Sequence, residues 1–206
     1  MTTLPSDEDK LLSAHLIIHA SSTAAAIVAG AAASIPIIGP MAAGSVVLTG
    51  ITAGMVIAVG DLYGYSFHTG AILGLAGQIL GMTFGAGLLK TALSLIPGVG
   101  TVSNAVVTFG VTESIGWGAY LIFREGKDIT LLGQEELKGY MDQGKAYAAN
   151  AKTEFAWLDH LPPHVKAQYD YLTRKLTNAD LSDADRKQVL GEIEELIKAY
   201  KPAPAV

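Results

Sequence analysis

Cysteine is absent from the 206-residue chain. Without a thiol, the protein has no disulfide, no thiolate nucleophile and no cysteine-ligated metal. Proteins that face the reducing cytoplasm rarely contain disulfides, so this absence is typical of a cytoplasm-facing chain.

Charge is almost absent from residues 11–123, where Asp61, Lys90 and Glu113 are the only acidic or basic residues. The 16% of charged residues are therefore concentrated at the ends, and residues 124–206 alone carry 12 Lys and Arg and 14 Asp and Glu. A water-soluble bundle needs polar groups over its outer face, whereas a bilayer removes that need. The pattern favours a membrane-embedded domain.

A basic leader and basic blocks are also missing. The first ten residues carry three acids and one lysine, which is not the pattern of a cleavable signal peptide, so we expect insertion through internal helices. The net charge of −5 argues against nucleic-acid binding.

Catalytic motifs are missing as well. The sequence has no Gly-x4-Gly-Lys-Ser/Thr phosphate loop, no nucleophile elbow and no paired carboxylates. His15 and His19 are four residues apart and share a helix face, a spacing that can hold a metal, but no third ligand lies nearby in sequence. We therefore expect no enzymatic activity, no cofactor and no metal site.

One short motif occurs twice within the charge-free stretch. Ile-Pro-Ile-Ile-Gly at 35–39 is followed 61 residues later by Ile-Pro-Gly-Val-Gly at 96–100, and each lies between two long aliphatic runs. Proline ends a helix because it lacks an amide donor and disfavours helical geometry in the preceding residue. Each motif therefore predicts the tip of a helical hairpin, with tip residues Pro36, Gly39, Pro40, Pro97, Gly98 and Gly100.

The expected fold is all-α, with two apolar helical hairpins followed by a soluble helical tail. Four helices of 20 to 25 residues, each long enough to cross about 30 Å of hydrocarbon, are expected at about 11–34, 41–62, 70–95 and 102–123. Tail helices are expected at about 131–158, 164–176 and after Ser182, where Asp185 completes a capping-box-like start. The predicted divisions are a polar leader 1–10, a membrane domain 11–127, a cytosolic tail 128–201 and a frayed end 202–206.

The polar junctions lie at one end of the four predicted helices and the apolar tips at the other. Aromatic and polar residues at such a junction are typical of a membrane–water boundary, predicted here for Asp61, Tyr63, Tyr65 and Trp117, although Trp117 fits a core position equally. Lysines and arginines flanking this end favour the cytoplasmic side of a bacterial inner membrane, with the termini and tail in the cytoplasm. The hairpins either cross the bilayer or re-enter it.

Glycines recur along the third predicted helix, and the candidates for close helix packing are Gly70, Gly74, Gly77, Gly81 and Gly85. Glycines spaced by four lie on one side of a helix and permit close approach by another. Two interpretations stay open, a seam between copies of the chain or packing within one four-helix unit.

Lys90 and Glu113 are the ionisable residues inside the predicted membrane helices. Such groups are costly in lipid and are functional candidates, as in ion pathways. Folding the second hairpin about Gly98 leaves the two residues too far apart for a direct pair, and Lys90 can extend its ammonium toward the tip-side surface.

The stretch at about 31–127 resembles the YcjF-like bacterial family of domains of unknown function. The resemblance is carried by Ser-Ile-Pro-Ile-Ile-Gly-Pro at 34–40, Asp-Leu-Tyr-Gly at 61–64, Leu-Ile-Pro-Gly-Val-Gly at 95–100 and Phe-Arg-Glu-Gly-Lys at 123–127. It implies a membrane-associated helical module, often attached to or encoded beside Era-like or dynamin-like GTPase domains. This chain has no nucleotide domain, so a GTPase would be a separate partner.

These features predict a membrane-embedded, self-associating structural or adaptor protein that presents its cytosolic tail to a soluble partner such as a GTPase. The alternative is a pore-forming or toxin-like protein whose hairpins insert into a target membrane. A third hypothesis is a soluble assembly that buries the hairpins between protomers.

Overall fold

The structure is a computed structural model that describes residues 7–33, 40–92, 100–176 and 182–202. Within these ranges side chains are described except at 31–33, 40–45, 82–92, 100–104 and 183.

The described residues contain helices and no strand, so the all-α prediction is confirmed. The long helices are α1 (Asp7–Ala33), α2 (Pro40–Leu62), α3 (Thr69–Ala92), α4 (Gly100–Arg124), α5 (Gln134–Glu154), α6 (Pro163–Leu176) and α7 (Asp183–Ile197). Short 3₁₀ turns follow α4, α5 and α7 at Ile129–Leu131 (η1), Ala156–His160 (η2) and Lys198–Tyr200 (η3).

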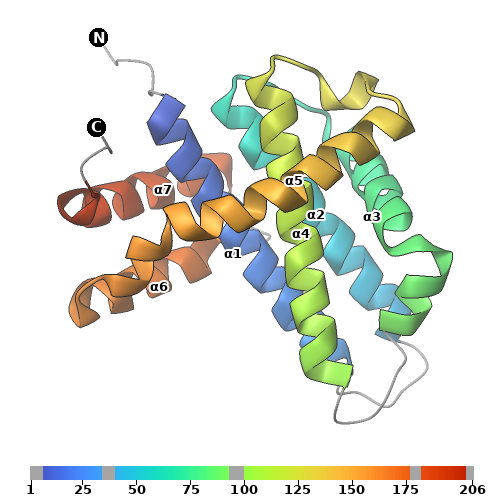
Figure 1. Ribbon diagram of the computed structural model, residues 1–206, viewed down its shortest axis with the longest axis horizontal. Helices are drawn as coiled ribbons and strands as arrows, with labels where there is room; N and C mark the ends of the chain where they lie inside the picture. The colour runs from blue at the N-terminus through green and yellow to red at the C-terminus, as the bar shows by residue number, and fades with distance from the viewer. Residues whose placement is uncertain (1–6, 34–39, 93–99, 177–181, 203–206) are drawn as a thin grey trace.

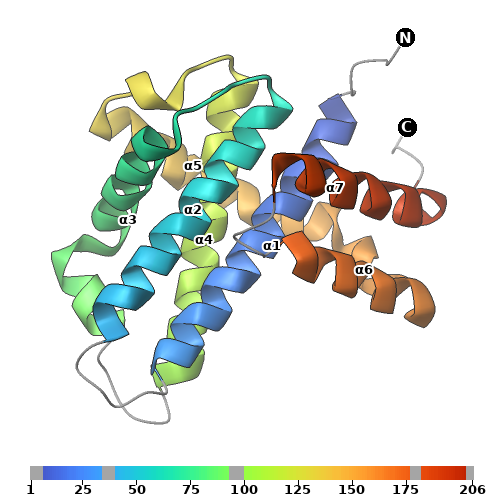
Figure 2. The same cartoon turned by 180° about the vertical axis from the view of Figure 1, so that it is seen from behind.

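The first four helices run alternately up and down in one bundle (Figures 1 and 2). We call the end where α1 and α3 finish and α2 and α4 begin the distal end, and the opposite end the proximal end. The polar start of α1, the α2–α3 connection and the end of α4 lie at the proximal end (Figure 1). This is the arrangement of two hairpins that the repeated motif predicts.

Glycines fix where two of these helices stop. Gly64 and Gly126 follow α2 and α4 with φ of 78° and 73°, a left-handed conformation that glycine adopts without a Cβ penalty. After α4, the N–H of Gly126 donates to the carbonyl of Phe123 and that of Lys127 to the carbonyl of Ile122. The same pair of bonds follows α2, so both helices end at the proximal end in a Schellman motif.

Local signals also place the tail elements. The Ser182 hydroxyl accepts a hydrogen bond from the Asp185 N–H at 3.1 Å, which confirms the predicted cap of α7. Asp128 caps η1 in the same way by accepting from the Thr130 N–H at 2.8 Å.

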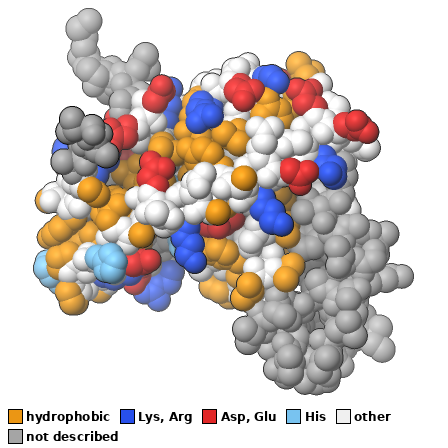
Figure 3. Space-filling model, viewed as in Figure 1, with side chains coloured by type: hydrophobic (Ala, Val, Ile, Leu, Met, Phe, Trp, Pro, Cys, Tyr) orange, Lys and Arg blue, Asp and Glu red, His pale blue; other side chains and the backbone are white. Residues whose placement is uncertain are grey.

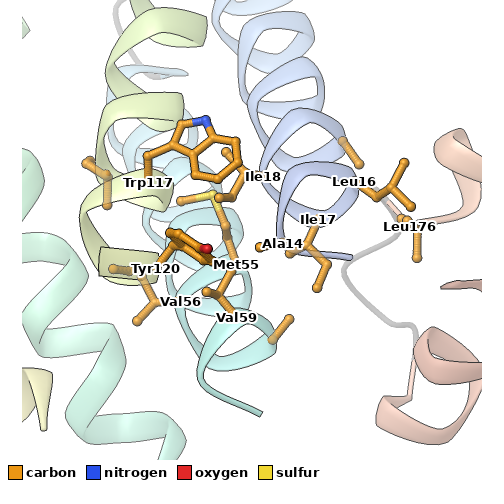
Figure 4. Packing of buried hydrophobic residues seen from close by; sticks show 14 of the residues in the cluster. Ala14, Leu16, Ile17, Ile18, Met55, Val56, Val59, Trp117, Tyr120 and Leu176 are labelled. Atoms are coloured by element: carbon orange, nitrogen blue, oxygen red, sulfur yellow. The ribbon is translucent and has the colours of Figure 1, made fainter. Parts of the chain in front are cut away.

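Helix α1 is the wall shared by the bundle and the tail. Its residues 12–18 are all buried, because α2 and α4 pack on one side and α6 and α7 approach the other. Figure 4 shows Ile18 meeting Met55 and Trp117 inside the bundle, while Leu16 points toward Leu176 of α6. The tail therefore lies on the bundle and shares one hydrophobic core with it.

The tail is also held to α1 by polar contacts. Lys201 pairs with Glu8 at 2.9 Å, and the Ser13 hydroxyl donates to the Glu194 carboxylate. The solvent-accessible Lys201–Glu8 ion pair contributes little, about 0–1 kcal/mol. The buried apolar contacts of α1 are the larger contribution to docking of the tail.

Helix α5 crosses α4 diagonally and approaches its backbone closely (Figure 1). A Cβ on Gly144 would collide with the carbonyl oxygen of Ser114 and the N–H of Gly118, both of them backbone atoms. A Cβ on Gly118 would in turn lie 2.6 Å from Met141 Cε and 2.9 Å from the Tyr140 carbonyl oxygen. Only glycine fits on both sides of this crossing.

A Gly144→Ala substitution is therefore expected to destabilise the protein by about 3 kcal/mol, since backbone atoms must move to admit the methyl group. Gly139→Ala is the matched control on α5, because a Cβ there meets nothing within 4 Å. It should be neutral or stabilise the helix by up to about 1 kcal/mol. Thermal unfolding followed by circular dichroism in mild detergent compares the two, and equal midpoints would contradict the close crossing.

Candidate membrane-inserting site

The distal half of the bundle exposes apolar side chains. Of the nine large hydrophobic side chains exposed among the described residues, five lie there: Ile27, Val46, Val47, Val106 and Val107. Val46 and Val106 are 71% and 66% exposed. Apolar patches of this kind on an otherwise folded surface mark contact with a membrane or another protein.

Charge is missing from the same half. The sequence has no acidic or basic residue in α1 after His19, in the first half of α2 or in α4 before Glu113. In the distal half of α3 the only charged residue is Lys90. The described Lys, Arg, Asp and Glu side chains belong to the proximal ends of the bundle helices, to Glu113 and to the tail. Charge and exposed apolar surface are thus separated along the bundle axis.

A polar pair marks the boundary between the two halves. His19 Nδ1 of α1 lies 3.5 Å from Glu113 Oε1 of α4, with the two side chains 43% and 18% exposed. His19 also meets Phe109 edge-on at a ring separation of 5.5 Å. The carboxylate that the sequence leaves unpaired in mid-helix thus has a histidine partner on the neighbouring helix.

His15 lies one turn before His19 in a buried aromatic setting. Its ring stacks on Phe155 at 4.0 Å and lies 6.1 Å from that of Trp117. Burial, with a smaller contribution from neighbouring His19, lowers the pKa of His15 from 6.5 to about 3. The imidazole is therefore neutral at physiological pH.

A cavity of about 290 Å³ opens beside these histidines, between α1, α4, α5 and α6. Its polar lining comes from His15, His19, Glu113, Lys152, Asp159, Lys166 and Tyr169. Lys166 is engaged by Asp170 at 3.0 Å and Asp159 at 3.9 Å. Burial raises the pKa of Tyr169 to about 12, so its phenol stays protonated.

A second hollow, of about 550 Å³, lies between α4 and α5. We call it the α4–α5 groove. On the α4 side it is lined by Val106, Val107 and Val111, and on the α5 side by Met141 and Ala148 together with the charged Lys138, Asp142 and Lys145. Apolar side chains of α4 thus face two lysines and an aspartate of α5 across the groove, and Glu113 of α4 lines it as well.

The glycine row of α3 makes no tight contact within the chain. Added Cβ atoms on Gly74 and Gly81 would meet nothing within 4 Å, and those on Gly70 and Gly77 would reach only His68 at 3.6 Å and Thr49 at 3.9 Å. The side of α3 carrying these four glycines is exposed, while Gly85 has no described side-chain position. This arrangement leaves the interpretation as a seam between copies open.

Several predicted residues lie outside the described part of the chain. The tip residues Pro36, Gly39, Pro97 and Gly98 are outside it altogether. Pro40 and Gly100 begin α2 and α4, and Lys90 lies in α3, but their side-chain positions are not described.

The aromatic residues predicted for a membrane boundary pack against the protein itself. Tyr65 stacks on Phe67 and lies 5.0 Å from Phe123, while Tyr63 meets Tyr120 edge-on. Through these aromatic contacts the α2–α3 connection packs against the proximal end of α4. Asp61, in the last turn of α2, is half-buried.

Trp117 occupies the core, the second of the two settings that the sequence left open for it. It is 1% exposed and lies 4.9 Å from Tyr147 of α5 and 5.4 Å from Tyr120. Helix α5 covers this part of α4, so Trp117 faces neither water nor lipid.

Sequence reasoning missed the residues where helices approach most closely. Gly116 packs against Ile18 and Met55, and Gly118 against Gly144 of α5. The signal was the spacing of Gly116 and Gly118 on either side of Trp117, which puts glycine on two faces of one helix turn. The His19–Glu113 pair was also missed, because folding the second predicted hairpin offers only Lys90 to Glu113 and does not place α1 beside α4.

No protein-family profile matches the chain, and no curated protein or solved structure is significantly similar to it. The YcjF-like resemblance therefore stays a prediction. Among the described residues, no group of three or more His, Cys, Asp or Glu side chains is placed to hold a metal.

Two described helical segments are long and apolar enough to cross a membrane, Asp7–Gly30 and Ala105–Arg124. Within them 61% and 67% of the most apolar window is buried inside the protein, and core helices of soluble proteins pass the same test. The described apolar parts of α2 and α3, Val46–Leu62 and Thr69–Gly81, are shorter. Length and composition thus give weak support for membrane association.

The neutral state of His15 predicts acid sensitivity. The unfolded chain binds a proton at His15 below about pH 6.5, whereas the folded chain does so only near pH 3. The stability that His15 allows is therefore complete above pH 6.5 and is lost as the pH falls toward 3. Lowering the pH from about 6.5 to about 4.5 should cost about 2 kcal/mol through this group.

His15→Phe keeps an aromatic ring against Phe155 and removes the titration, so it should lose about 2 kcal/mol less than the parent over that pH range. His68→Phe, at an exposed position, is the control and should follow the parent. Urea unfolding at the two pH values measures the difference. An unchanged pH dependence in His15→Phe would show that another group carries it.

Proposed function

We propose that the protein is a membrane-inserted structural or adaptor protein, in which the distal half of the bundle enters the bilayer and α5–α7 stay outside it. The observation that carries the proposal is the axial separation of charge from exposed apolar surface. Val46, Val106 and their neighbours project from a half whose sequence has Lys90 as its only charged residue. Lipid accepts such a surface, whereas water does not.

The depth of insertion follows from the position of α5. From Gly100 to Glu113, α4 rises about 20 Å, which is less than the hydrocarbon core of about 30 Å. Beyond Glu113, α5 covers α4 at Ser114 and Gly118 and carries charged side chains on its outer face. We therefore propose that the hairpins enter the bilayer without crossing it, which the position of α5 supports.

The exposed glycines of α3 support self-association. Helices in lipid associate through small residues that let backbones approach, and Gly74 and Gly81 have open space where a neighbour would pack. A second copy of the chain is the partner we propose for this side of α3.

The tail supports the adaptor part of the proposal. Tyr171 of α6 is 56% exposed and has the Lys175 ammonium 5.0 Å from its ring, an aromatic and basic surface of the kind enriched at protein interfaces. A soluble protein would bind here, and a GTPase is the partner suggested by the YcjF-like resemblance. The inner membrane of a bacterium, with the tail in the cytoplasm, is the proposed location.

The double substitution Val46→Lys/Val106→Lys is expected to abolish insertion. A lysine in the hydrocarbon region costs about 3 kcal/mol, so each change should weaken binding to vesicles about a hundredfold. Flotation of the purified protein with phosphatidylcholine vesicles measures the bound fraction. Leu131→Lys is the matched control, because Leu131 is 82% exposed but lies in η1 at the proximal end.

The control should float like the parent. Failure of the parent to float, or equal flotation of the double variant, would contradict insertion through the distal half. Dye entrapped in the same vesicles distinguishes the proposed scaffold from the alternative, a pore-forming protein. A scaffold leaves the dye inside the vesicles, whereas a pore former releases it.

A further inference from the structure

Three lysines form a row along one side of α5. Lys138, Lys145 and Lys152 are seven residues apart, close to two helical turns, so their side chains lie on the same side of the helix. Figure 3 shows basic groups spaced along the diagonal course that α5 takes in Figure 1. All three are exposed.

The row faces the distal half of the bundle. Lys138 and Lys145 line the α4–α5 groove together with Val106 and Val107. Lys152 lines the adjoining cavity beside His19 and Phe109. The row thus lies just proximal to the apolar surface proposed to enter lipid.

Two of the four acidic residues of α5 lie on the side opposite the lysines, whereas Asp142 lines the α4–α5 groove with two of them. Glu136 and Glu154 are 18 residues apart, which is five full turns, so they share one side of the helix. Glu136 pairs at 3.0 Å with Lys127, which follows α4 at the proximal end. Helix α5 therefore carries lysines toward the distal half and these glutamates toward the proximal end.

Two of the three lysines make no ion pair with another described residue. Lys138 pairs with Asp142 at 3.3 Å, whereas Lys145 and Lys152 have no such partner. Glu113, the other acid of the groove, is engaged by His19. The cavity beside Lys152 adds Asp159, which lies 3.9 Å from Lys166. The unpaired ammonium groups are left for an external anion.

We propose that this lysine row binds the phosphate groups of anionic phospholipids, with an acyl chain along Val106 and Val107 in the α4–α5 groove. Phosphate complements the two unpaired ammonium groups, and the apolar α4 wall complements the chain attached to it. Helix α5 then lies along the membrane surface and sets how far the distal half enters. The inference rests on the proposed membrane insertion and adds the lipid class and its site.

The test compares phosphatidylcholine vesicles with vesicles that also contain phosphatidylglycerol. The parent should bind the anionic vesicles more tightly, and the triple variant Lys138→Gln/Lys145→Gln/Lys152→Gln should lose that preference. The expected loss is about fivefold for each lysine, or about a hundredfold in all. Binding of the triple variant to phosphatidylcholine should stay at the parent's level, since insertion through Val46 and Val106 is intact.

Arg174→Gln/Lys187→Gln/Lys198→Gln is the matched control, with the same loss of charge at three tail positions outside the groove and the cavity. It should retain the preference for anionic vesicles. The variant Lys138→Arg/Lys145→Arg/Lys152→Arg should also retain the preference for anionic vesicles. That result would show that the glutamine variant loses the preference through its lost charge and not through misfolding.

Equal loss in the two glutamine variants would show that net charge alone is responsible and would overturn the proposal. An unchanged preference in the Lys138, Lys145 and Lys152 variant would overturn it too. Either result leaves binding to phosphatidylcholine intact and the proposed function standing, whereas absence of all vesicle binding by the parent would remove both.

Discussion

The glycine crossing between α4 and α5 is the contact on which the division of the molecule depends. Because Gly118 and Gly144 lack side chains, α5 lies against the α4 backbone and covers the proximal half of the bundle. The chain then continues through η2 into α6 and α7, which reach α1 from the other side. The distal half stays uncovered, and the exposed valines are found there.

Helix α1 is apolar along most of its length, but its two halves lie in different environments. Its first half is enclosed on several sides by protein, and the His15 ring stacks on Phe155 and lies near Trp117. Its second half ends in the distal region, where Ile27 is exposed. The absence of a polar stripe, which fits burial in lipid or in a protein core, thus arises in α1 partly from burial within the protein.

The helices were predictable because their ends carry local signals. Proline motifs, the glycines after α2 and α4 and the Ser182 cap each act within a few residues, so helix positions came out close to those observed. The alternation of polar junctions and apolar tips also predicted the two hairpins. Short-range chemistry was sufficient for both.

The site was less predictable because it depends on contacts between distant segments. Nothing near Gly144 in sequence indicates that it meets Gly118, and the partner of Glu113 lies on α1, more than ninety residues away. Trp117 suited a membrane boundary until α5 was placed over it. The docking of α5 on α4 decided the positions of Gly144 and Trp117, and the packing of α1 against α4 decided the partner of Glu113. Amphipathic periodicity does not specify where a helix docks.

The central claim is that the distal half lies in hydrocarbon while the proximal end lies in water. Because the chain has no cysteine, the single variants Val106→Cys, Leu131→Cys and Gln143→Cys can each carry an environment-sensitive fluorophore in the vesicle-bound protein. Gln143 is exposed on the side of α5 that carries Glu136, away from the lysine row. Lipids with a quencher deep in the acyl chain should quench the label at 106, while iodide in solution should quench those at 131 and 143. Iodide quenching of all three labels alike would contradict the account.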